Sequence, residues 1–192
     1  MNISRARPGE RDRAFIAYLE GLQAAEDRAA LAALRRGLGR PPGTAAEMHR
    51  YVVPWLPREE SPREDEAYYL AAALFGLYPE GSWPREEAEQ GWHNLGASFA
   101  HLASRADSGS VEQRFVALLG AHRDDLPEHL RHAVSLLKAH EVRVDWVELL
   151  ADIRWWDHEE RRVQRRWARA FWGAVAADTE SNADKNLADQ AK

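Results

Sequence analysis

The stretch Asp27–Arg40, DRAALAALRRGLGR, decides the fold class of this chain. Its leucines recur with the period of an α-helix, Asp27 stands where an N-terminal cap belongs, and glycines at 37 and 39 end the helix before two prolines. Ala, Leu, Glu and Arg also dominate the rest of the chain, with almost no alternation of β-branched residues. The pattern therefore predicts an all-α protein.

Breaks at proline and glycine divide the chain into nine predicted helices. They lie at about residues 9–23, 27–38, 44–56, 63–78, 91–106, 110–122, 125–140, 145–155 and 157–175. Ser110 is the predicted N-cap of the helix over 110–122, and Asp157 with Glu160 gives the last helix a start that resembles a capping box. We expect two packed helical lobes, an N-terminal one over 1–78 and a C-terminal one over 91–175, and a disordered tail over 176–192.

Composition argues against several classes of protein. The 192 residues include 26 Lys and Arg against 31 Asp and Glu, and a net charge of −5 argues against a polycation that coats nucleic acid by bulk charge. The absence of cysteine excludes disulfides, thiolate-bound metals and thiol nucleophiles. No apolar run approaches the ~20 residues of a membrane span, and the N-terminus has no signal-peptide core. We therefore expect a cytoplasmic protein that does not enter a membrane.

Positive charge gathers on the last predicted helix. On a helical wheel at about 100° per residue, Val163 and Trp167 lie on an apolar arc, while Trp172 lies on the opposite, basic side. There its indole is placed to stack on a base or on another subunit. The sequence alone leaves two interpretations equally open, a phosphate-binding ridge or a solvated face paired to acids such as Glu148 or Asp152. The arginines that share the basic arc are Arg161, Arg162, Arg165, Arg166 and Arg169.

A second basic cluster favours the phosphate-binding interpretation. Arg28, Arg35 and Arg36 occupy an arc of about 100° on the helix over 27–38, and Arg40 follows in a loop of glycine and proline. Residues 28–50 contain five arginines and one glutamate, whereas the acids concentrate in 59–66, 86–89 and the tail. Arginine outnumbers lysine, which codon usage alone can produce but which also supplies the better bidentate phosphate ligand. A merely solvated surface does not require this segregation of charge.

The sequence contains no recognisable catalytic or metal-binding pattern. His129 and His132 share a predicted helix face, as do His93 and His101, but there is no His-Glu-x-x-His arrangement, and such pairs are more often surface residues than ligands. Ser98 lacks the second glycine of a nucleophile elbow, and no glycine-rich phosphate loop is present. We therefore predict neither an enzyme nor a bound metal or cofactor.

Eight tryptophans are many for this length, and four of them are predicted to lie in the core. Trp83 and Trp92 flank the connector over 78–91 and are placed to anchor it or to mark a partner surface. The tryptophans at apolar helix positions, which we predict to be buried, are Trp55, Trp146, Trp155 and Trp167.

Ordered pieces along residues 12–173 together resemble one family. The chain looks like CasB, the small subunit of the type I-E CRISPR surveillance complex Cascade. The tail after about residue 175 has no counterpart in this resemblance. The pieces that carry it are Arg28–Arg40 continuing into Pro41, Pro42 and Gly43, YYLAAALF over 68–75 ahead of Pro79, NLGASFA over 94–100, VSLLKA over 134–139, Val144-Asp145-Trp146, and the closing stretch Asp157–Trp172.

The resemblance implies a non-catalytic protein of two packed helical lobes that acts in antiviral defence. Two copies would contact each other and the backbone and large subunits of Cascade. Their basic faces would hold the guide RNA–target DNA heteroduplex and the displaced strand, which stabilises the R-loop. The alternative is a helical adaptor whose basic faces bind acidic protein partners. The matching nucleic-acid-binding positions are Arg28, Arg35, Arg36, Arg40, Arg161, Arg162, Arg165, Arg166 and Arg169, with Lys138 and Arg143 as weaker candidates.

Overall fold

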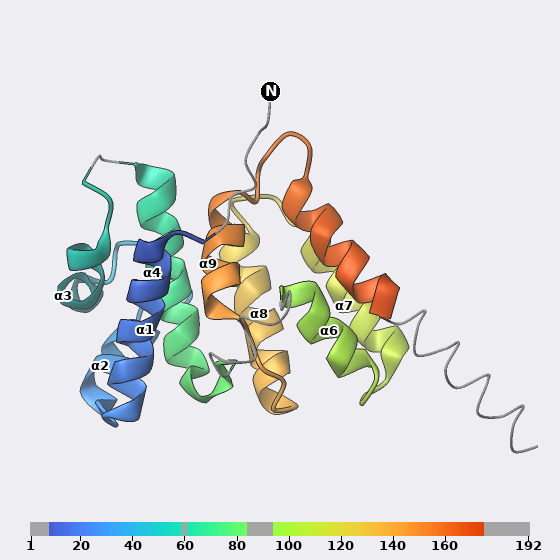
Figure 1. The fold of residues 1–192 in the computed structure, drawn as a ribbon, viewed down its shortest axis with the longest axis horizontal. Coiled ribbons are helices and arrows are strands. Elements are labelled where there is room, and N and C mark those ends of the chain that lie inside the picture. The colour runs from blue at the N-terminus through green and yellow to red at the C-terminus, as the bar shows by residue number, and fades with distance from the viewer. Residues whose placement is uncertain (1–7, 59–60, 84–93, 175–192) are drawn as a thin grey trace, which may run out of the picture.

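A computed structural model describes residues 8–58, 61–83 and 94–174 and confirms the all-α fold (Figure 1). Within these ranges the extended structure is a single bridge between Ser82 and Val144. The helices are α1 (Glu10–Ala24), α2 (Arg28–Arg35), α3 (His49–Val52) between the 3₁₀ turns η1 (Ala46–Met48) and η2 (Val53–Trp55), α4 (Pro62–Leu77), the turn η3 (Pro79–Gly81), α6 (Leu95–Ala103), α7 (Ser108–Leu119), α8 (Leu126–Ala139), α9 (Trp146–Arg154) and a C-terminal helix over 162–174.

Helix α4 lies at the centre of the packing. Every residue from Ala67 to Gly76 is buried, which is the pattern of a helix enclosed on all sides. It packs against α2, α9 and α8, and Figure 1 shows α1–α4 on one side, α8 and α9 in the middle, and α6, α7 and the C-terminal helix on the other. One apolar core runs from Phe15 in α1 to Phe171 in the C-terminal helix. The predicted lobe boundary falls near residues 84–93, which lie outside the described residues, as does the tail, so both stay predictions.

The predicted N-cap of α2, Asp27, is confirmed, whereas the C-terminal end of the helix differs from the prediction. The Asp27 carboxylate accepts a hydrogen bond from the backbone N–H of Ala30 at 2.9 Å, which satisfies one of the unpaired donors of the first turn. The helix ends at Arg35, earlier than predicted, because the chain then turns toward Gly39, whose φ of +71° suits glycine. Asp145 caps α9 in the same way as Asp27, through the N–H of Glu148 at 2.9 Å.

Two predicted N-caps are wrong, and the helix predicted over 91–106 is observed as the shorter α6, Leu95–Ala103. Helix α7 begins at Ser108, so Ser110 lies inside its first turn and is not the N-cap. The last helix begins at 162, and the chain over 155–160 forms turns. Arg161 has a φ of +48°, and its N–H donates to the carbonyl of His158 at 2.7 Å, which closes a turn where the predicted helix would begin. The capping box of Asp157 and Glu160 therefore does not form.

The shift of this helix start also changes which tryptophans are buried. Trp146 and Trp167 belong to the core as predicted, and Trp55 is partly buried against Phe15. The predicted burial of Trp155 is wrong, since 44% of its surface is exposed, because the turn that follows α9 directs Trp156 inward instead.

The predicted helix over 44–56 is likewise replaced by three short segments, η1, α3 and η2. Pro54 lies in the last of them and has no N–H to continue an α-helix.

A buried ion pair joins α1 to α9 beside α4. The Nη2 atom of Arg154 donates to Asp12 Oδ1 at 2.7 Å, and the hydroxyl of Tyr68 donates to the same oxygen at 2.8 Å. Burial alone would raise the pKa of Asp12, but the hydrogen bond and charge of Arg154, with the Gly9 N–H and the Tyr68 hydroxyl, hold that pKa below its ordinary value. The pair therefore fixes the crossing of three helices.

Candidate nucleic-acid interface

The arginines of the first cluster are all exposed around α2, but they differ in how their charge is balanced. Arg36 forms an ion pair with Glu47 at 2.8 Å. Arg28 and Arg40 form no ion pair within the described part of the chain. Exposed guanidinium groups outside ion pairs are the ones free to bind phosphate, so within this cluster the structure favours Arg28 over Arg36. The charge of Arg40 helps to lower the pKa of the Glu47 carboxyl, so it is partly balanced by that acid.

Two predicted cations that are distant in sequence meet at the C-terminal end of α4. The Nε atom of Arg35 donates to the carbonyl of Gly76 at 3.0 Å, and the Nζ atom of Lys138 donates to the carbonyl of Leu77 at 2.8 Å. These carbonyls are among the last of the helix, where intrahelical partners run out and the macrodipole is negative. Arg35 and Lys138 therefore have a structural role in capping α4 while remaining exposed.

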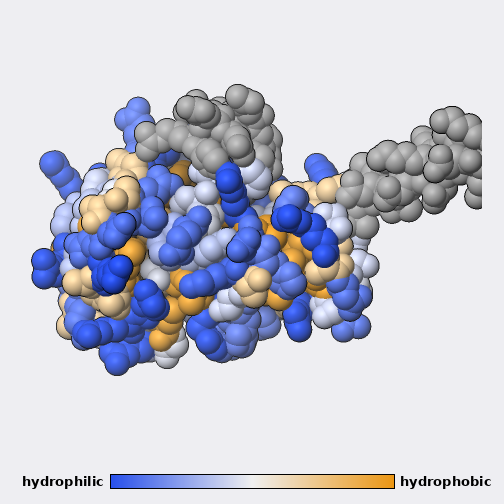
Figure 2. All heavy atoms as spheres, turned by 90° about the horizontal axis from the view of Figure 1, so that it is seen from below, coloured by the Kyte–Doolittle hydropathy of each residue, from blue (hydrophilic) through white to orange (hydrophobic). Residues whose placement is uncertain are grey.

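Arg143 lies beside the segment that follows α4. Its guanidinium carbon is 6.0 Å from the centre of the Trp83 ring, and the N–H of Val144 donates to the carbonyl of Gly81 at 2.7 Å. The structure thus brings the weaker candidates, Lys138 and Arg143, near the region that Arg35 occupies. The view from below in Figure 2 shows hydrophilic residues over much of this face of the molecule, with smaller apolar areas between them.

The five arginines of the second cluster do not all lie on one helix, because the C-terminal helix begins at 162 and Arg161 precedes it. Arg165 and Arg169 are four residues apart on this helix, both exposed, and neither forms an ion pair within the described residues. One guanidinium N–H of Arg165 reaches the carbonyl of Glu160 at 3.4 Å. Arg161 lies in the preceding turn and donates to the carbonyl of Leu119 at the end of α7. All three side chains are exposed and form no ion pair within the described residues, although the charge of Arg165 contributes to lowering the pKa of the Glu160 carboxyl.

The remaining two arginines of this cluster are neutralised by acids. Arg162 pairs with Glu160 at 2.7 Å, and this hydrogen bond lowers the pKa of the Glu160 carboxyl. Arg166 binds the buried carboxylate of Asp152 and lies 3.5 Å from Glu148. These are the two acids named in the alternative interpretation of this helix, which therefore describes Arg166 correctly.

Trp172 is exposed on the basic side of the C-terminal helix, as predicted. It retains 37% of its accessible surface. Its Nε1 atom donates to Glu112 Oε1 of α7 at 3.2 Å, and its ring packs against Phe115 at 5.7 Å between centroids. The indole is thus held in place although it faces solvent.

The family of the chain follows from comparison with known proteins. The family model described as CRISPR-associated protein Cse2 matches residues 30–172, which include both basic clusters apart from Arg28. The chain belongs to the CRISPR-associated Cse2 family.

Relatives of this Cse2-family chain match it over most of its length. The CRISPR-associated protein Cse2 of Thermus thermophilus is 41% identical over 177 residues, which cover 90% of this chain and 95% of the relative. The crystal structure of M. ruber CasB is 35% identical, covers 89% of this chain and 97% of its own, and has a TM-score of 0.74. A chain of a structure titled CRISPR RNA-guided surveillance complex is 29% identical, with coverages of 90% and 98% and a TM-score of 0.76.

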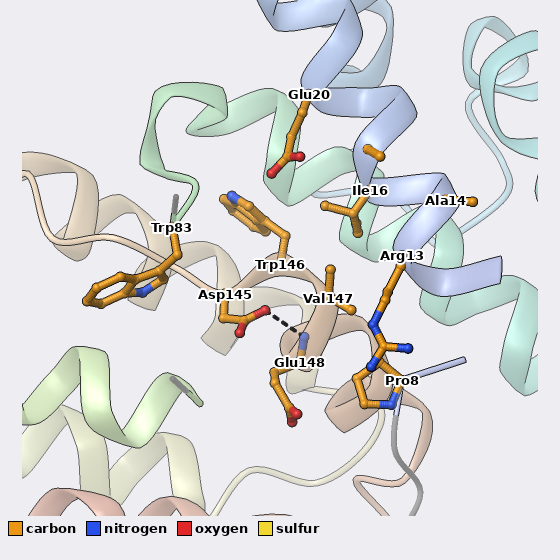
Figure 3. A pocket seen from close by; sticks show the side chains of 11 residues that line it. Pro8, Arg13, Ala14, Ile16, Glu20, Trp83, Asp145, Trp146, Val147 and Glu148 are labelled. Carbon is orange, nitrogen blue, oxygen red and sulfur yellow. Dashed lines mark hydrogen bonds between the residues drawn. The ribbon is translucent and has the colours of Figure 1, made fainter. Parts of the chain in front are cut away.

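The structure of this Cse2-family chain also contains a cavity that the sequence did not indicate. It has a volume of about 580 Å³ and lies between α1, Trp83 and the start of α9 (Figure 3). Trp146 forms part of its wall, and Glu20, Asp145 and Glu148 bring carboxylates to it. These acids disfavour a phosphate inside the cavity, although Arg13 also lines it, and the lining residues Trp83 and Glu148 lie beside Arg143 and Arg166.

The described residues contain neither a cluster suited to a metal ion nor a helix suited to a membrane. Among the described residues, no three His, Asp or Glu side chains gather into a group that could hold a metal ion; His93 lies outside those residues. No described helix combines the length and the apolar character needed to cross a membrane.

Arg123 was not singled out in the sequence, and the structure shows why it is not a phosphate ligand. Only 16% of its side chain is exposed, and its Nη1 atom donates to the carbonyl of Ile153 at 2.6 Å. Its guanidinium group also lies within ion-pair distance of Glu66 and Asp157. Position in the sequence does not distinguish it from Arg165, because the difference arises only from packing against α9 and α4.

Proposed function

We propose that this Cse2-family chain is a non-catalytic subunit of a Cascade surveillance complex in antiviral defence, and that its arginine-rich surfaces bind nucleic-acid backbone and stabilise the R-loop. The observation that carries the proposal is the contrast within the C-terminal helix. Arg162 and Arg166 are neutralised by acids, whereas Arg165 and Arg169 are exposed and form no ion pair within the described residues. Two aligned, exposed cations that are not held in ion pairs are suited to bind phosphates.

The energetics of an R-loop make such contacts effective. The guide RNA–DNA heteroduplex is about as stable as the DNA duplex that it replaces, so a few phosphate contacts shift the balance toward the open state. Arginine side chains on a helix face bind the backbone and not the base edges, so they stabilise every target equally and leave sequence recognition to the guide. The net charge of −5 limits binding of the free subunit to bulk DNA before assembly.

Assembly with other subunits and with a second copy is part of the same proposal. The 29% identical chain from the structure titled CRISPR RNA-guided surveillance complex supports this part of the proposal. The exposed apolar side chains of Val53, Val116 and Trp155 supply surface of the kind that protein contacts bury.

The proposal is tested with the double variant Arg165→Glu/Arg169→Glu of the full chain, alone and in the reconstituted complex. Retention of single-stranded DNA is measured across a salt series. If both arginines neutralise phosphates, the variant binds more weakly and its log–log salt slope is less steep by about 1.4, at about 0.7 per contact. The matched control is Arg105→Glu/Arg131→Glu, which changes net charge equally at two arginines that contact His101 and Glu128.

Two results would contradict the proposal. If wild type shows no salt-dependent retention of nucleic acid, the basic faces serve acidic protein partners, as the adaptor alternative requires. If both double variants weaken binding equally, bulk charge and not the C-terminal helix accounts for the affinity.

A further inference from the structure

Trp172 lies where an aromatic side chain can act together with Arg165 and Arg169, the two exposed arginines of this helix that form no ion pair within the described residues. The described part of the C-terminal helix advances by about 100° and 1.5 Å per residue, so Arg165, Arg169 and Trp172 fall within an arc of about 60° over about 10 Å of helix length. All three side chains are exposed. The helix therefore presents two cations and one indole in a row along one face.

Trp172 is held by one hydrogen bond and by two aromatic neighbours. The bond from Nε1 to Glu112 Oε1, at 3.2 Å, uses an N–H that lies in the plane of the ring. Phe115 and Phe171 meet the indole at 59° and 88°, as tilted and edge contacts and not as parallel stacks. The indole is thus oriented before any ligand arrives, which reduces the entropy lost on binding.

We infer that Trp172 stacks on an unpaired base of single-stranded nucleic acid whose phosphates lie on Arg165 and Arg169. This inference rests on the proposed function and deepens it. Grooves that bind single strands combine cations that follow the backbone with aromatic rings on which bases stack, and this face has both. The adjacent cations favour a polyanion over an apolar protein surface. A base in a duplex is already stacked on both sides, so this site selects the displaced strand over the heteroduplex.

The test compares two 12-nucleotide oligonucleotides of equal charge, oligo-dT and the same backbone without bases. Affinities are measured with the full chain across a salt series, and the two strands are compared at the same salt concentration. The variants are Trp172→Ala, which removes the ring, and Trp172→Phe, which keeps an aromatic face. Trp155→Ala is the matched control, because Trp155 is also exposed but lies in the turn after α9 and not on the C-terminal helix.

Stacking of one base predicts that wild type prefers oligo-dT over the abasic strand by about 5-fold to 100-fold. Trp172→Ala abolishes this preference while the salt slope stays unchanged, Trp172→Phe retains most of it, and Trp155→Ala behaves as wild type. Circular dichroism and thermal melting check that each variant is folded, since Trp172 also packs on Phe115.

The remaining outcomes overturn the inference in distinguishable ways. If wild type binds both strands equally and with salt dependence, stacking is refuted while backbone binding stands. If Trp172→Ala keeps the preference, the stacking residue lies elsewhere. If Trp172→Ala changes only the sedimentation of the chain, the indole belongs to a protein contact. If wild type binds neither strand at any salt, the proposed function of this helix fails as well.

Discussion

The Nε1 atom of Trp167 donates a hydrogen bond to Asp152 Oδ2 at 2.6 Å, so a buried carboxylate of α9 fastens the C-terminal helix to the rest of the molecule. The other oxygen of Asp152 binds Arg166. This junction assigns a structural role to one arginine of the basic stretch and leaves Arg165 and Arg169 facing outward. The same contact thus positions the helix and determines which of its charges can bind a partner.

Asp152→Asn tests this junction. The substitution keeps a side chain of similar shape but removes the charge that faces Arg166, whose remaining acidic neighbour is Glu148 at 3.5 Å. Breaking a buried pair in this way is expected to lower the free energy of unfolding by about 3 kcal/mol in a urea titration. Asp124→Asn, at a carboxylate that is 86% exposed, should change it by less than about 0.5 kcal/mol. Equal effects of the two substitutions would refute the structural role of Asp152.

The pair of Asp12 and Arg154 predicts a dependence of stability on pH. Because the pKa of Asp12 is lower in the folded than in the unfolded chain, its contribution is fully present above the unfolded value of about 4 and is lost as pH falls through the folded value. Asp12→Asn is expected to cost about 3 kcal/mol at pH 7 and progressively less below pH 4. Urea unfolding of both proteins at pH 7 and at pH 3 measures the difference, and a pH-independent difference would contradict the prediction.

Gly96 is predicted to tolerate no side chain. A Cβ atom there would lie 2.2 Å from the backbone oxygen of Trp167, so α6 and the C-terminal helix would have to separate. Gly96→Ala is therefore expected to lower the free energy of unfolding by about 3 kcal/mol. Gly21→Ala is the matched control, because nothing lies within 4 Å of its Cβ position in α1, and a gain of up to about 1 kcal/mol is expected. If Gly96→Ala is neutral in thermal and urea unfolding, the close approach of these helices is wrong.

The adjacent tryptophans after α9 provide another test. Trp156 is 2% exposed, and its Nε1 atom donates to the carbonyl of Ala121 at 3.0 Å, so Trp156→Ala is expected to cost about 4 kcal/mol. Trp155→Ala should cost less than about 1 kcal/mol, because 44% of its surface is already exposed. The reverse order in urea unfolding would mean that the chain follows the helix register predicted from sequence.

The sequence alone was sufficient to predict those features of the fold that depend on residues close together in the chain. The N-cap at Asp27 and the period of the leucines in α2 depend on residues within a few positions of each other, and both are observed. It failed at 157–161, where a helical pattern continues in the sequence but the chain turns. The backbone there is held by His158 and by contacts to the end of α7, including the bond from Arg161 to Leu119, which no local pattern contains.

The sequence by itself determined that the protein is all-α, and it located the two basic stretches, because helix period, capping and charge are properties of neighbouring residues. Only the tertiary structure decided whether Arg165 and Arg166 face solvent or bind an acid from another helix. Arg165 and Arg166 are neighbours in the chain, yet one faces solvent and the other binds Asp152 from α9. The reason is physical: an arginine is available to a phosphate only where neither the local turn, as for Arg162, nor the packing of distant helices, as for Arg166, brings an acid to it.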